Sequence, residues 1–198
     1  NRCTADTELV ARHDRKVRRM LAGYGIGILA AAALFVSAQE RLGSIRQTDV
    51  IRKVVERKLA AEPGNAALHL LLANMYYEQR RYKDAEAHYR AALQIEPMHP
   101  ETLNNLAWLY ATAEDARYRD PEQALRLALR AAELDPQPHV LDTLAESYYA
   151  NGAYAEAVAT IKRAIAQKPE DAAYYQRQLE KFEERLDVER RKDEELAD

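Results

Sequence analysis

Apolar and polar residues divide the chain into an uncharged stretch near its start and a longer part where apolar residues recur at helical spacing. Residues 20–38, MLAGYGIGILAAAALFVSA, carry no charged side chain. As a helix this stretch would be roughly 28 Å long, close to the thickness of the hydrocarbon layer of a bilayer. We therefore predict a transmembrane helix over residues 20–38. A secretory signal peptide is the alternative, because Val36, Ser37 and Ala38 resemble a small-residue cleavage site.

Basic residues flank this stretch unevenly. Residues 12–19 contain five Arg or Lys, whereas residues 39–46 contain two. Because basic residues favour the cytoplasmic side, we expect residues 1–19 to form a cytoplasmic tail and the larger C-terminal part to lie on the other side. Gly23 and Gly27 would share one helix face, where small residues let a second membrane helix approach; small residues are also common in membrane helices in general.

The rest of the chain contains an internal repeat with a period of 34 residues. Three segments align, residues 66–99, 100–137 and 138–171, and the second is longer because of an insertion within residues 111–120. Residues 39–65 then form a linker with a partial-repeat helix, and residues 172–198 form a capping helix with a charged tail. In the insertion, Arg117, Tyr118 and Arg119 are candidates for a contact point; an elongated, solvated turn is the simpler interpretation.

Small, aromatic and proline residues recur at matching positions of the three segments. The first has Leu72, Ala73, Tyr76, Ala85, Tyr89, Ala92 and Pro97; the second has Leu103, Leu106, Ala107, Tyr110, Ala124, Ala131 and Pro136; the third has Leu141, Leu144, Ala145, Tyr148, Ala157, Ile161, Ala164 and Pro169. This pattern resembles the tetratricopeptide repeat (TPR) family, in which each repeat is a pair of antiparallel helices. The second segment departs from the pattern at Ala128, where an aromatic residue is expected, and this weakens one packing contact.

The physical properties of these residues agree with the resemblance. Small residues such as Ala73 and Ala85 let two helices approach, and large ones such as Tyr76 fill the space between helix pairs. A proline near the end of each segment stops the second helix, because proline cannot continue it. The predicted fold is all-α: an N-terminal transmembrane helix followed by an α-solenoid of three TPR helix pairs with helical caps.

Two apolar helix faces flank the repeats and are predicted to cap them. Before the first repeat, this face consists of Ile51, Val54, Val55 and Leu59; after the third, it consists of Tyr174, Tyr175, Leu179, Phe182 and Leu186. Beyond Leu186 the chain is almost entirely charged, and we expect it to fray.

Composition excludes several classes of protein. The 198 residues are 31% charged and 47% hydrophobic, with a mean hydropathy of −0.55, which argues against a polytopic membrane protein. The net charge of −3 argues against a general nucleic-acid-binding surface. Cys3 is the only cysteine, so no intramolecular disulfide is possible.

No residue pattern indicates an enzyme, a metal site or a cofactor. The five histidines are scattered, and neither a phosphate-binding glycine loop nor a Cys-x-x-Cys pair occurs. We expect His69 to be a packing residue in the first repeat. Residues 3–9 resemble the last part of a zinc ribbon, but Asp6 replaces its second cysteine, which favours a plain tail with a free thiol.

The first helix of each repeat is predicted to line a concave groove that binds a partner protein. The residues expected there are Asn74, Tyr77, Glu78, Asn104, Asn105, Trp108, Asp142, Glu146 and Tyr149. Trp108, the only tryptophan, is the preferred anchor; packing against a neighbouring helix is its alternative role. With Asp142 and Glu146 exposed in the groove, a basic or neutral partner segment would fit better than an acidic one.

The resemblance implies a protein–protein interaction function: a scaffold anchored in the bacterial inner membrane, with its repeats in the periplasm, that assembles or matures envelope protein complexes. A permanent accessory subunit of a large membrane complex is the alternative. A sensor with a cytoplasmic zinc knuckle is a third interpretation, and it requires further cysteines upstream of Asn1.

Overall fold

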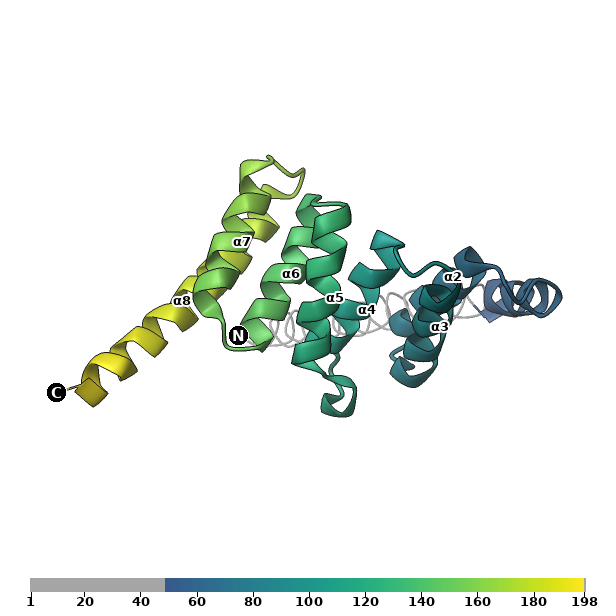
Figure 1. Ribbon diagram of the computed structural model, residues 1–198, viewed down its shortest axis with the longest axis horizontal. Helices are drawn as coiled ribbons and strands as arrows, with labels where there is room; N and C mark the ends of the chain where they lie inside the picture. Colours follow the sequence, from purple (N-terminus) through teal and green to yellow (C-terminus); the bar gives the residue numbers. More distant parts are fainter. Residues whose placement is uncertain (1–48, 198) are drawn as a thin grey trace, which may run out of the picture. The chain divides into compact units, whose positions relative to one another are not determined.

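The computed structural model describes residues 49–197, and from Arg52 onward they belong to one compact unit. A first helix covers residues 49–61. It is followed by α2 (Ala66–Glu78), α3 (Tyr82–Ile95), α4 (Pro100–Thr112), a short 3-10 helix η1 (Ala116–Tyr118), α5 (Pro121–Leu134), α6 (Pro138–Ala150), α7 (Tyr154–Ala166) and α8 (Ala172–Ala197). Figure 1 shows α2 to α8 as successive antiparallel helices, so the described part is a stack of three helix pairs closed by α8.

Most helix starts have a capping side chain or a proline, and prolines follow the ends of the second helices. The side chains of Asn65 and Asp120 accept backbone N–H groups at the starts of α2 and α5, at 3.1 and 3.0 Å. Pro100, Pro121 and Pro138 are the first residues of α4, α5 and α6, where their missing N–H costs no helical hydrogen bond. The second helices α3, α5 and α7 end two or three residues before the prolines predicted to stop them.

Alanines and aromatic residues pack at the helix crossings as the repeat pattern predicts. Ala73 and Ala85 are fully buried where α2 meets α3, and Tyr76 and Tyr89 are buried in the same core. In the second pair, Ala128 is buried against Ala107 and Leu144, with Tyr148 packed at the edge of the cluster. Ala128 therefore lies in a core that the second repeat shares with α6 of the third.

The turns inside the first and third pairs use the left-handed backbone region at matching positions. Gly152 has φ of +77°, as the Asn-Gly sequence predicts, whereas Arg80 adopts φ of +58° at a strain that glycine avoids. The second pair replaces this tight turn with the insertion that contains η1. Tyr118 of η1 packs against Tyr82, with ring centroids 5.8 Å apart, so the insertion contacts the first repeat rather than extending freely into solvent.

The two ends of the stack are covered to different extents. On the first helix, Val55 is buried and Leu59 partly buried against the first repeat, but Ile51 and Val54 are more than half exposed, so only half of the predicted apolar face is used. At the other end, Phe182 of α8 is fully buried against α6 and α7. The helix then continues to Ala197 where fraying was predicted, because the charged residues there are strong helix formers.

The predicted fold class requires one correction, because it included a transmembrane helix. Within residues 49–197 no helix combines the length and the apolar character needed to span a bilayer; the repeat helices are 13 or 14 residues long, and the longer α8 is largely charged. The predicted span over residues 20–38, with Gly23 and Gly27, lies outside the described residues, as does Cys3. The fold is therefore an all-α stack of helix pairs, without a membrane helix in its described part.

Candidate functional site

The inner helices α2, α4 and α6 carry two pockets that meet at Trp108, which lines both of them. Trp108 is half-buried on α4, and its indole N–H donates no hydrogen bond to any described residue. A large aromatic side chain in this state offers apolar surface and an unused donor to a binding partner.

The first pocket, of about 350 Å³, lies between the first and second repeats. It is lined by Asn74, Tyr77, Glu78, Tyr89, Asn105 and Trp108. The Asn74 Oδ1 accepts the Tyr89 hydroxyl at 2.7 Å and the Asn105 Nδ2 at 3.1 Å. These bonds hold the two amides in fixed orientations, while Glu78 stays exposed and forms no ion pair with a described residue.

Unlike the amide side chains of Asn74 and Asn105, that of Asn104 does not line a pocket. It is 7% exposed and lines neither pocket; its Nδ2 donates to Asn105 Oδ1 at 3.2 Å, and its own Oδ1 is buried without a partner among the described residues. Asn104 therefore helps to orient the Asn105 side chain through this hydrogen bond and does not face a ligand.

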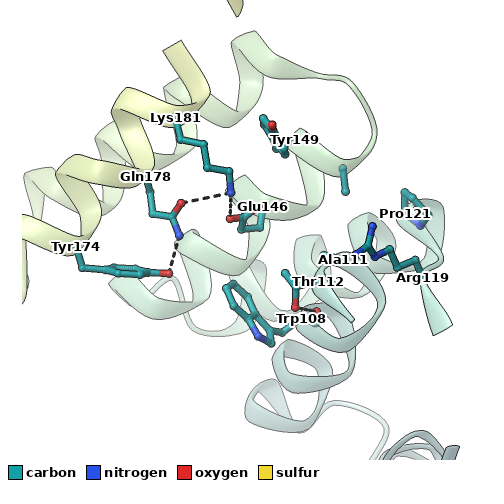
Figure 2. Close-up of a pocket in the computed structure, with 11 residues that line it drawn as sticks. Trp108, Ala111, Thr112, Arg119, Pro121, Glu146, Tyr149, Tyr174, Gln178 and Lys181 are labelled. Carbon is teal, nitrogen blue, oxygen red and sulfur yellow. Dashed lines mark hydrogen bonds and ion pairs between the residues drawn. The ribbon is translucent and has the colours of Figure 1, made fainter. Parts of the chain in front are cut away.

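The second pocket is larger, about 580 Å³, and lies where α4, the insertion, α6 and α8 converge (Figure 2). It is lined by Trp108, Ala111, Thr112, Arg119, Pro121, Glu146, Tyr149, Ala150, Tyr174, Gln178 and Lys181. Figure 2 shows Tyr174, Gln178 and Lys181 of α8 along one side and Arg119 on another, so two cations and three aromatic residues from different elements share one cavity.

Helix α8 covers the two acids that the sequence predicts for the groove of the third repeat. Lys181 Nζ forms an ion pair with Glu146 and lies 4.7 Å from the centre of the Tyr149 ring. The Tyr174 hydroxyl donates to Asp142 Oδ2 at 2.8 Å, and Gln178 Nε2 donates to the same hydroxyl at 2.8 Å. Because both acids are engaged within the chain, neither is free to attract a basic partner.

Burial dominates the electrostatics of Asp142. This side chain is 6% exposed, and its Oδ1 has no partner among the described residues. Desolvation raises the pKa of Asp142 to about 6, against an opposing effect of the Tyr174 hydrogen bond and with a further rise from nearby Glu146. The same burial raises the pKa of the Tyr174 hydroxyl well above its usual value, so this group stays a donor.

Arg119 provides a positive charge that the repeat alignment does not predict for the groove. Its Nε donates to the Ala113 carbonyl at 2.6 Å, which anchors the guanidinium at the rim of the second pocket. No carboxylate among residues 49–197 forms an ion pair with Arg119, so its terminal nitrogens remain available.

The structure thus sorts the predicted groove residues into four groups. Asn74, Tyr77, Glu78 and Asn105 line the first pocket, Trp108 lines both, and Glu146 and Tyr149 line the second, whereas Asn104 and Asp142 are buried beneath. Sequence reasoning missed Tyr174, Gln178 and Lys181. Their spacing of four and three residues puts them on one face of α8, a signal that was available in the sequence.

The histidines form one pair within the described residues. His69 and His88 face each other with their Nδ1 atoms 3.0 Å apart and their ring centroids 5.2 Å apart, so His69 packs between α2 and α3 as predicted. In the part of the chain that the structure describes, no cluster of three or more metal-binding side chains occurs.

Comparisons with known proteins agree with this architecture. Tetratricopeptide repeat models match residues 66–99 and 140–173. Human and mouse protein O-mannosyl-transferase TMTC1 are each 42% identical over 55 residues, 28% of this chain but 6% of theirs.

Two solved structures share the fold. A thermophilic TPR protein of Thermus thermophilus, TTC0263, matches 72% of this chain and 75% of its own, with a TM-score of 0.56 and 18% identity. PilW, a type IV pilus biogenesis factor, matches 66% and 67%, with a TM-score of 0.52 and 22% identity. The helix pairs, the packing alanines and these matches together show that the chain carries tetratricopeptide repeats.

Proposed function

We propose that this chain is a non-catalytic scaffold that holds a segment of a partner protein in the groove on both sides of Trp108. Tetratricopeptide repeats are protein–protein interaction scaffolds, and the fold is typically not catalytic. The observation that carries the proposal is the position of Trp108 at the junction of two open pockets, with its indole N–H unused by any described residue. Central aromatic residues of this kind commonly dominate the affinity of protein interfaces.

We also propose that the partner is a protein of a complex that this scaffold helps to assemble. PilW, which shares the fold, is a biogenesis factor, and this likeness supports assembly as a role without identifying the complex. A location of the repeats outside the cytoplasm of a bacterial cell stays a prediction from the basic residues before residue 20.

The alternative, a permanent accessory subunit, is favoured by a different observation. The outer helices α3 and α5 and the turn after α3 expose several large apolar side chains: Ile95, Met98, Leu129 and Leu134. A subunit held in a fixed complex would cover such residues, because obligate interfaces are more apolar than transient ones. The two functions therefore predict contacts on different faces of the repeats.

Site-specific photocrosslinking in cells tests the proposal. The full chain would carry p-benzoylphenylalanine either in place of Glu78, which is exposed in the first pocket, or in place of Leu129 on the outer face. We expect the variant at position 78 to crosslink a defined protein and the variant at position 129 to give none. Crosslinks from position 129 alone would contradict the groove proposal, and equal crosslinks from both positions would favour the accessory subunit.

A further inference from the structure

The lining of the second pocket carries one positive charge, that of Arg119, that no carboxylate among the described residues pairs with. Its lining contains two cations, Arg119 and Lys181, and one acid, Glu146. Lys181 and Glu146 balance each other, and the Glu146 side chain is only 10% exposed, whereas that of Lys181 is 40% exposed. The charge that faces the cavity is therefore net positive.

The Arg119 guanidinium is held in place for binding. The hydrogen bond from its Nε to the Ala113 carbonyl fixes one edge of the planar group, and the other edge keeps its donors without a described partner. An arginine restrained in this way loses little side-chain entropy when it binds a carboxylate with two parallel hydrogen bonds.

Aromatic rings line the same pocket as these cations, and Lys181 lies over the Tyr149 ring. Trp108 and Tyr149 line the same pocket, and Tyr149 is fixed by ring contacts with Tyr154 and Phe182 at centroid distances of 5.4 and 5.2 Å. A side chain with an aliphatic stem and a charged end, such as glutamate, fits this combination of apolar wall and cationic rim.

We propose that the second pocket binds an acidic side chain, Glu or Asp, of the partner segment, with Arg119 as the residue that recognises its carboxylate. This inference rests on the proposed function, since it names the chemistry of the segment held beside Trp108. It also reverses the expectation that the groove prefers a basic or neutral segment, because Asp142 and Glu146 are engaged by Tyr174 and Lys181.

A peptide selection on the full chain tests this proposal. A random 12-residue library displayed on phage through the peptide C-terminus would be selected in parallel on the unmodified chain, R119Q, R126E and W108A. R119Q removes the charge but retains a donor for the Ala113 carbonyl. Arg126 is a matched control, because it is an exposed arginine of α5 that lines neither pocket.

We expect the unmodified chain and R126E to enrich peptides that contain Asp or Glu, and R119Q to lose this preference. One selected peptide, synthesised with an amidated C-terminus, would then be titrated while the emission of Trp108, the only tryptophan, is recorded. Replacing its acidic residue by the amide should weaken binding to the unmodified chain about tenfold or more. The same replacement should leave binding to R119Q unchanged.

The outcomes separate the two proposals. Enrichment that W108A abolishes, with no acidic preference or with the same preference in R119Q, would overturn the carboxylate inference and leave the groove function standing. The absence of any enrichment that depends on Trp108 would overturn the groove function and the inference with it.

Discussion

The first and third repeats use matching positions of their inner helices for different purposes. Asn74 and Tyr77 of α2 correspond to Glu146 and Tyr149 of α6 in the repeat alignment. In the first repeat these positions line an open pocket. In the third repeat Glu146 is paired with Lys181, and Tyr149 packs on Phe182 of α8. Both repeats line a pocket at these positions, but only in the third repeat does the following helix, α8, already contact the side chains.

Among the substitutions that test this difference, we expect Phe182→Ala to have the largest effect, because it removes the apolar side chain of α8 that is buried most completely against the third repeat. Phe182 is fully buried between α8 and the third repeat, so its removal should lower the free energy of unfolding by about 3–5 kcal/mol and loosen α8. Urea denaturation followed by far-UV circular dichroism measures the loss.

Leu196→Ala on the same helix is the control for Phe182→Ala. Leu196 is 85% exposed, so we expect a change within about 0.5 kcal/mol. A loss below about 1 kcal/mol in Phe182→Ala would contradict the assignment of α8 as part of the stack.

The buried acid of the third repeat should respond to pH. The folded-state pKa of Asp142 is about 6, above its ordinary 3.8, so the folded state binds this proton more tightly. Protonation of Asp142 therefore stabilises the folded state fully below pH 3.8, and this stabilisation is lost as the pH rises through 6. Asp142→Asn cannot ionise and keeps an acceptor for Tyr174, so it should raise the free energy of unfolding at pH 7.5 by up to about 3 kcal/mol.

Urea denaturation of Asp142→Asn and the unmodified chain between pH 4 and pH 7.5 measures this effect. The gain should shrink towards zero at pH 4, where Asp142 is largely protonated. Asp187→Asn, on the exposed face of α8, should show no such gain. A gain in Asp142→Asn that stays constant with pH would mean that ionisation of Asp142 is not its cause.

The smallest expected change in the free energy of unfolding concerns a hydrogen bond of the first repeat. Tyr89→Phe removes one hydrogen bond to Asn74, which still accepts from Asn105, so the free energy of unfolding should fall by about 1 kcal/mol. Thermal denaturation of the variant measures this change. Tyr148→Phe is the matched control, since the Tyr148 hydroxyl makes no hydrogen bond within residues 49–197. Equal losses in the two variants would show that the bond to Asn74 contributes nothing.

The repeat pattern predicts the packing of the helix pairs well, because each packing position recurs at a fixed place in every repeat. Ala73, Ala85 and Tyr89 lie where the pattern indicates. The apolar face of α8 predicts that this helix caps the third repeat, but not that it engages Asp142 and Glu146, because these polar contacts depend on how two helices far apart in sequence approach each other. Tyr174 bonds Asp142 across 32 residues, and no local spacing encodes that contact.

The same limit applies to the candidate site. The alignment predicts which positions of α2 and α4 face inward, and hence Asn74, Asn105 and Trp108. It cannot predict that Arg119 of the insertion lines the second pocket together with Trp108, since the insertion has no counterpart in the other repeats.

The insertion has a consequence for how such an array can diversify. Asp120 N–H returns to the Tyr110 carbonyl at 3.1 Å, so the loop leaves and re-enters the stack beside a single helix end. Its length and sequence can change without shifting the register of one helix pair on the next. New ligand preferences can therefore arise through small insertions and substitutions in this loop, while the alanines that pack at the helix crossings stay the same.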